Sequence, residues 1–137
     1  MVKKNISKVI YLFPEQQKEI SIARAYNEFV DTWNKMAKEN NLPTGWYWES
    51  LSEGSKFKRM FKARWKEPVF REKYKEAIDL IPESDFLLGQ NNHGWRANIE
   101  WFLRPDTIQK ILNNFYSGRE RRFGYEAEGF ERKDYTE

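Results

Sequence analysis

The spacing of large apolar side chains constrains the fold of this chain more than any other feature. Between residues 18 and 40 these side chains recur at steps of three and four, which places them on one face of an α-helix. That face consists of Ile22, Ala25, Tyr26, Phe29, Val30, Trp33, Met36 and Ala37. A short apolar run at residues 9–13 has no visible partner strand, so we predict an all-α fold.

Similar patterns predict four more helices downstream. Phe57, Phe61 and Trp65 lie four residues apart on one helical face, and Ser55 is suited to cap the N-terminus of that helix. Pro68 is suited to the first turn of the next helix. The predicted helices span residues 56–66, 68–81, 95–103 and 106–115.

The domain organisation follows from length and composition. A length of 137 residues is that of one domain, and an aromatic content of 17% is typical of a folded chain rather than a disordered one. We predict a compact bundle of about four to five helices over residues 18–116. Residues 1–17 would form an N-terminal arm docked on the core, and residues 117–137 a charged tail that is flexible when free.

Charge is distributed unevenly along the chain. Residues 55–75 hold nine Lys or Arg against two acids, whereas residues 76–106 hold two against six. The helix over 56–66 contains no acid, although a structural surface helix usually mixes both signs in stabilising pairs. Its basic residues are Lys56, Lys58, Arg59, Lys62, Arg64 and Lys66.

We predict that this basic helix contacts phosphates, which supply the salt-sensitive part of nucleic-acid affinity. Lys58, Arg59, Lys62 and Lys66 would point outward for this purpose. The alternative is that the basic face is merely solvated, or that it pairs with the acidic segment 76–106 within the fold.

Two further segments are candidate parts of a nucleic-acid interface. The tail interleaves arginines with aromatic rings, a mixture that binds single strands through phosphate contacts and base stacking. Glutamates in the tail offset part of its positive charge, so a tail that is merely solvated is the alternative. The loop after the first helix carries three aromatic residues that form either a stacking platform or a lid on the core. The residues concerned are Arg119, Arg121 and Arg122 in the tail and Trp46, Tyr47 and Trp48 in the loop.

Nothing in the sequence predicts catalysis. The chain has no cysteine, and its single histidine, His93, lies in a turn sequence, so it also lacks the ligands of a zinc site. Asp79, Glu83 and Asp85 are candidates for a divalent cation, and the region of Asp106 superficially resembles a nuclease motif. Their positions at helix ends and turns favour capping instead. We therefore expect no enzyme, no metal and no cofactor.

A series of Trp, Gly and Pro positions runs through the C-terminal part of the predicted bundle. It consists of residues 84–87 (SDFL), Gly89, residues 94–97 (GWRA), residues 101–103 (WFL), Pro105, residues 110–112 (KIL) and Tyr116. This series resembles the C-terminal helical module of phage and prophage replication proteins of the replisome-organiser, initiator or helicase-loader type. The resemblance covers residues 24–118 and implies a stand-alone module, because residues 1–17 are too short for the winged-helix domain that such proteins usually carry.

We therefore predict a phage or mobile-element accessory DNA-binding protein that acts in DNA replication in the cytoplasm of a bacterial host cell. We expect the partner to be DNA rather than RNA. We do not expect the protein to read the base sequence. The alternative is a protein-binding inhibitor or adaptor that uses the same basic face, either a modulator of a replicative helicase or an anti-defence protein, such as an anti-CRISPR, that binds a host defence protein. The chain lacks an apolar run of about 20 residues and a secretory signal, so no membrane partner is expected.

Overall fold

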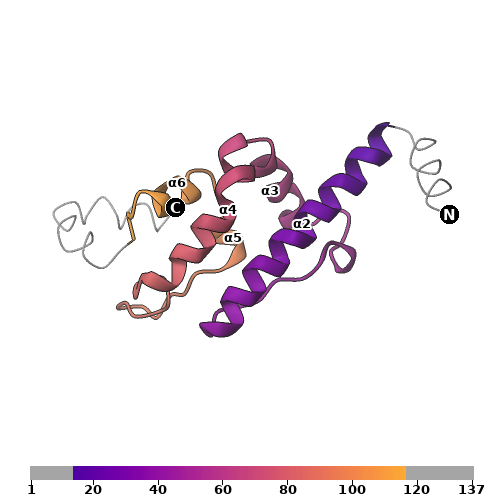
Figure 1. Ribbon diagram of the computed structural model, residues 1–137. Helices are drawn as coiled ribbons and strands as arrows, with labels where there is room; N and C mark the ends of the chain where they lie inside the picture. The colour runs from indigo at the N-terminus through magenta and orange to yellow at the C-terminus, as the bar shows by residue number, and fades with distance from the viewer. Residues whose placement is uncertain (1–13, 117–137) are drawn as a thin grey trace.

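The computed structural model describes residues 14–116, which form five α-helices and two short 3-10 helices and contain no strand. The helices are α2 (Pro14–Glu39), η1 (Trp48–Ser50), α3 (Lys56–Trp65), α4 (Pro68–Leu80), η2 (Ile81–Glu83), α5 (Ile99–Phe102) and α6 (Thr107–Leu112). α2 and α4 run side by side, and α6 packs against α4 on the side away from α2 (Figure 1). The predicted all-α bundle of about four to five helices is confirmed.

Ordinary capping chemistry explains where the first two α-helices begin. α2 begins at Pro14, because the fixed φ of proline suits the first helical position and Glu15 complements the positive end of the helix. The predicted arm over 1–17 is therefore wrong for residues 14–17, while residues 1–13 and 117–137 lie outside the described part of the chain. Ser55 caps α3 as predicted, since its Oγ accepts a hydrogen bond from the Phe57 N–H at 3.1 Å.

The helix predicted over residues 95–103 is shorter than expected. Only Ile99–Phe102 is helical, because Asn98 is the N-cap and its side chain accepts from the Trp101 N–H at 2.9 Å. Asn91 holds the preceding turn by donating to the Trp95 carbonyl at 2.7 Å and accepting from the Trp95 N–H at 3.1 Å. These local side-chain bonds compete with helix formation.

The last helix also departs from its predicted bounds. α6 covers Thr107–Leu112 rather than 106–115. Asp106 occupies the N-cap position, but it has a left-handed backbone (φ 70°) and its side chain makes no capping hydrogen bond, so the predicted capping role is wrong. The preceding Pro105 limits the conformations of Arg104 and helps to set this sharp entry into the helix.

Phe29 lies at the centre of an aromatic core. Its side chain is fully buried on α2. Its ring centroid lies 5.6 Å from that of Phe61 on α3, 5.7 Å from that of Tyr74 on α4 and 5.7 Å from that of Phe102 on α5. Aromatic rings bury large areas and prefer tilted or offset contacts of this length. One side chain therefore joins four helices.

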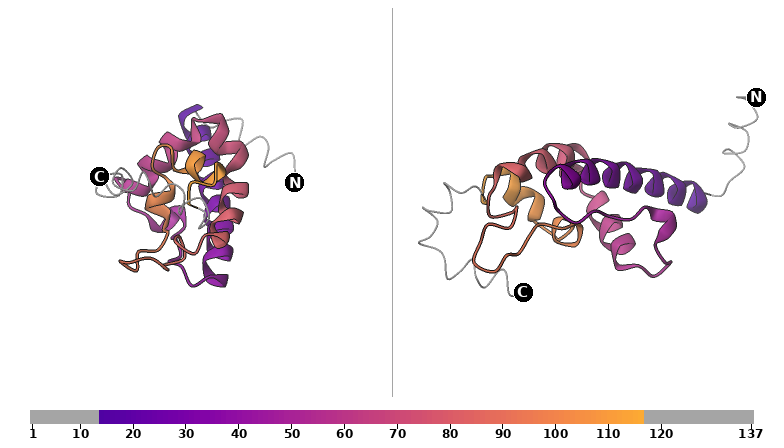
Figure 2. Two further views of the ribbon diagram at one scale, coloured as in Figure 1. Left: turned by 90° about the vertical axis from the view of Figure 1, so that its left-hand side faces the viewer. Right: turned by 90° about the horizontal axis from the view of Figure 1, so that it is seen from below.

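The loop that follows α2 folds back along the same helix, and α3 begins where this loop ends (Figure 2). This return places Trp48 of the loop beside Lys58 and Lys62 of α3. No helix within residues 14–116 is both long and apolar enough to cross a membrane.

We expect the substitution Phe29→Ala to lower the free energy of unfolding by about 3–5 kcal/mol, because it removes a ring from a core that cannot close the cavity. Urea unfolding followed by circular dichroism measures this change. Ile20→Ala is the control, since Ile20 lies on the same helix with 42% of its surface exposed. Equal losses in the two variants would contradict the central role of Phe29.

Candidate nucleic-acid interface

Four of the six predicted basic residues of α3 share one exposed arc. An α-helix advances by 100° per residue, which places Lys56, Arg59, Lys62 and Lys66 together around the exposed Ala63. α3 itself contains no acidic residue. We call these four residues the basic arc.

Lys58 does not belong to the basic arc, which corrects the prediction that it points outward. Only 7% of Lys58 is exposed. Its Nζ lies 4.7 Å from the ring centroid of Trp48, whereas Lys62 Nζ lies 5.8 Å from the same ring. A cation over an indole face is stabilised by the ring quadrupole, more so when water is excluded. Lys58 therefore holds η1 against α3 and is not free to contact a phosphate.

Arg64 is also occupied within the fold. Its side chain is 12% exposed, and its Nη1 lies 3.3 Å from Glu67 Oε2 without the alignment of a hydrogen bond. The buried Nε and Nη1 atoms have no hydrogen-bond partner among the described residues. The proximity of Glu67 provides only electrostatic compensation, so we assign Arg64 to the α3–α4 junction and not to the interface.

Two members of the basic arc form ion pairs with other elements. Lys56 Nζ lies 3.1 Å from Glu100 Oε2, and Lys62 Nζ lies 3.4 Å from Glu19 Oε1 on α2. Glu100 belongs to the acidic segment 76–106, so the expected internal pairing occurs for Lys56. All four side chains are between 40% and 53% exposed. Exposed pairs of this kind contribute at most about 1 kcal/mol and are screened by salt.

The other two members make no ion pair with residues 14–116. Arg59 donates from Nη1 to the Gly54 carbonyl at 2.8 Å, which leaves further guanidinium N–H groups available. Lys66 is exposed at the C-terminal end of α3. Arg71 adds a cation nearby, because its Nη1 donates to the Trp65 carbonyl at 2.6 Å. Arg71 is not one of the contact residues predicted from the sequence, although it lies within the basic block 55–75.

The predicted tail residues Arg119, Arg121 and Arg122 lie outside the described residues. The aromatic loop, by contrast, is fully described, and its three residues divide between the two alternatives. Trp48 is buried and acts as part of the lid, whereas Trp46 is 67% exposed and Tyr47 is 44% exposed. Neither alternative applies to the whole loop.

A row of polar side chains on α2 holds the exposed Trp46 in place from both sides. The Asn34 Oδ1 accepts from the Gly45 N–H at 2.7 Å, and its Nδ2 donates to the Gly45 carbonyl at 3.3 Å. The Tyr47 hydroxyl donates to Asp31. Asn27 Oδ1 accepts from the backbone N–H of residue 48 at 2.8 Å. The spacing of Asn27, Asp31 and Asn34 on one helical face was the sequence signal for this row.

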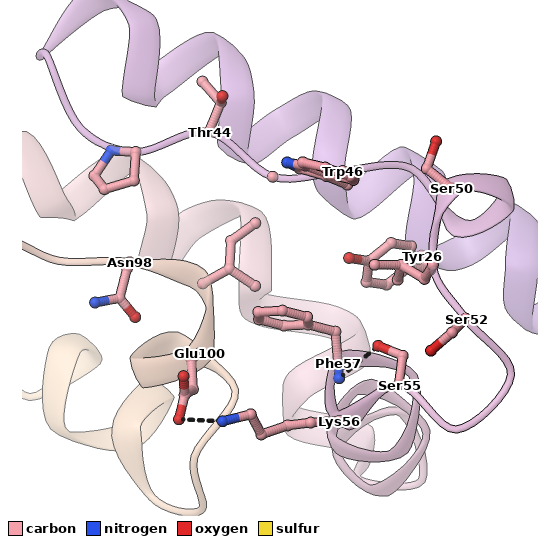
Figure 3. A pocket seen from close by; sticks show the side chains of 14 residues that line it. Tyr26, Thr44, Trp46, Ser50, Ser52, Ser55, Lys56, Phe57, Asn98 and Glu100 are labelled. Carbon is pink, nitrogen blue, oxygen red and sulfur yellow. Dashed lines mark hydrogen bonds and ion pairs between the residues drawn. The ribbon is translucent and has the colours of Figure 1, made fainter.

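A cavity of about 560 Å³ opens beside Trp46, between the returning loop, the first turn of α3 and the start of α5. Phe57 and Trp46 stand on opposite sides of the open space, and Lys56 with Glu100 lies at one rim (Figure 3). The Tyr26 hydroxyl points into this space from α2 (Figure 3). Burial raises the pKa of Tyr26 to about 12, so the hydroxyl stays protonated at neutral pH.

The described residues contain no cluster of side chains that could bind a metal ion. Within residues 14–116, no group of three or more His, Cys, Asp or Glu side chains is arranged to hold a metal ion. Asp79, Glu83 and Asp85 are thus not assembled into such a site. His93 is exposed in a turn, where its backbone N–H donates to Asn91 Oδ1 at 3.0 Å.

Comparisons of the chain with models of protein families, with curated proteins and with solved structures gave no match. The resemblance to phage replication modules stays a prediction from the sequence. Function must therefore be argued from the basic arc, the loop and the cavity.

We expect Asn34→Ala to lower the free energy of unfolding by about 1–2 kcal/mol, because it removes two hydrogen bonds to Gly45. Hydrogen exchange of the Gly45 amide should become faster in this variant. Lys35→Ala is the matched control, since Lys35 is the next residue of α2 and is exposed. Unchanged exchange at Gly45 would contradict the proposed anchoring of the loop.

We expect the burial of Tyr26 to make stability sensitive to alkaline pH. An unfolded tyrosine ionises near pH 10, whereas the folded-state pKa is about 12. The contribution is therefore fully present below pH 10 and is lost as the pH rises towards 12, to a total of roughly 2–3 kcal/mol. Urea unfolding between about pH 8 and pH 11 should show a smaller loss for Tyr26→Phe than for the unmodified protein. An identical pH dependence would contradict this assignment.

Proposed function

We propose that this protein is an accessory DNA-binding protein that contacts the phosphate backbone through the basic arc. The observation that carries the proposal is an exposed helical surface of four cations with no acid on the same helix. Like charges at four-residue spacing, as in Lys62 and Lys66, destabilise an isolated helix. An anionic partner that spans the arc would remove this cost.

The internal ion pairs of the arc are compatible with exchange for phosphate. Lys56 and Lys62 are paired at the surface, where such pairs contribute little and salt screens them. Arg59, Lys66 and Arg71 are exposed and have no carboxylate partner within residues 14–116. We therefore expect Arg59 and Lys66 to contribute more to affinity than Lys56 and Lys62, which must first leave Glu100 and Glu19.

The resemblance of residues 24–118 to phage replication modules supports a role in DNA replication of a phage or mobile element. Backbone contacts position a protein on nucleic acid without reading its sequence. The exposed surface of α3 carries no Asn or Gln for adenine edges, and its Arg and Lys residues, which can also read guanine, are assigned to phosphates in this proposal. We therefore propose binding that is largely independent of base sequence.

A second candidate function is a protein-binding inhibitor or adaptor that uses the same surface. The exposed Trp46 and Tyr47 favour it, because Trp, Tyr and Arg are the residues that most often dominate binding energy at protein interfaces. The basic arc would then dock on an acidic surface of a helicase or a defence protein. Direct titration with DNA separates the two functions.

We expect the double substitution Arg59→Glu and Lys66→Glu to lower DNA affinity by at least tenfold in low salt. The slope of log affinity against log salt should also decrease by about 1.4–1.8, because each lost phosphate contact removes about 0.7 for single strands and 0.9 for duplexes. Fluorescence anisotropy with labelled oligonucleotides at several salt concentrations measures both quantities.

The control for this experiment is the double substitution Arg24→Glu and Lys35→Glu. It makes the same change in net charge with the same residue types, on the exposed outer face of α2. An equal loss of affinity in the control would show that only net charge matters, and the basic arc would not be the interface. A chain that binds no DNA at low salt would rule out the proposed function and favour the adaptor.

A further inference from the structure

The cavity beside Trp46 has the size and lining of a ligand site. Its volume of about 560 Å³ lies within the range of small-molecule pockets. Three aromatic side chains line it: the exposed Trp46, the half-buried Phe57 and the buried Tyr26. The two hydrogen bonds of Asn34 to Gly45 hold the neighbouring backbone, so the place from which the Trp46 side chain projects is set before any ligand arrives.

A polar group of the core faces this cavity. Tyr26 is only 1% exposed, and its hydroxyl points into the space between Trp46 and Phe57 (Figure 3). No residue within 14–116 forms a hydrogen bond with this hydroxyl. The oxygen itself is not fully buried, so water in the cavity reaches it, and a ligand that displaces this water needs a polar edge to replace its hydrogen bond.

The surroundings favour a planar ring with polar edges over an aliphatic side chain. An aliphatic group would cover Trp46 and Phe57 but would leave the Tyr26 hydroxyl without a partner, which is costly. Hydroxyl and amide groups at the rim add further donors and acceptors, and Lys56 connects the rim to the basic arc. These rim groups belong to Ser50, Ser52 and Asn98.

We infer that the cavity holds one base of a single-stranded nucleic acid. The base stacks on Trp46 and forms a hydrogen bond with the Tyr26 hydroxyl, while the adjoining phosphates follow the basic arc from Lys56 to Arg59. Bases within a duplex are stacked and paired, so the site requires a single strand. This inference rests on the proposed contact of the arc with phosphates, and it names the form of nucleic acid that the same surface prefers.

The test compares an oligothymidylate with an abasic oligomer of the same length, which has the same phosphates but no bases. We expect the unmodified protein to bind the oligothymidylate about tenfold more tightly, as is typical for one stacked base. Trp46→Ala should remove most of this preference and leave binding of the abasic oligomer unchanged. Tyr26→Phe should reduce the preference about threefold, and circular dichroism verifies that both variants fold.

Val69→Ala is the matched control, because Val69 is another exposed apolar residue, on α4 and outside the cavity lining. It should retain the full preference. Equal binding of the two oligomers by the unmodified protein would overturn the inference while leaving phosphate contact intact.

A second measurement tests binding of a base in the cavity with a ligand too small to span the basic arc. Titration with thymidine monophosphate, followed through the Trp46 indole N–H resonance, should shift that resonance in the unmodified protein and less in Tyr26→Phe. This result would support stacking of a base in the cavity even if neither oligomer bound, in which case the contact of the arc with phosphates, and with it the path of the strand, would be overturned. No shift at Trp46, or an equal shift with toluene, would overturn the assignment of a nucleobase.

Discussion

The contact of Phe29 with rings from three other helices is the constraint on which the rest of the structure depends. α5 has four residues and α6 has six, lengths at which an isolated helix is unstable in water. These helices exist because their side chains bury against the longer α2 and α4. Phe29 and its neighbours Phe61 and Phe102 thus determine where α3 and α5 lie, and the two sides of the cavity follow from those positions.

The polar side chains of α2 fix the loop that the aromatic core alone does not hold. Asn27, Asp31 and Asn34 hold the returning loop by hydrogen bonds to its backbone and to Tyr47. A loop held in this way can keep a large aromatic side chain exposed without a core to pack against. The backbone of Trp46 therefore lies in a defined place next to the first turn of α3, and its side chain contributes surface rather than core.

The cations of α3 fall into two groups by burial. Lys58 and Arg64 are covered by the fold, the first by the Trp48 ring and the second at the junction with Glu67. The basic arc remains at the surface, where two of its members make weak pairs. A count of charges along the sequence overestimates the surface available to phosphates, because burial depends on what each side chain packs against.

The sequence by itself determined the helical class, the apolar face of α2, the cap at Ser55 and the acid-free composition of α3, since all of these depend on local spacing and capping. It did not determine that Lys58 is buried or that Trp46 and Trp48 separate, because adjacent residues of a loop face opposite environments only once the loop is anchored. The Tyr26 side chain belonged to the predicted apolar face, yet its hydroxyl reaches a cavity. That cavity forms between segments far apart in the chain, so only the tertiary structure decided it.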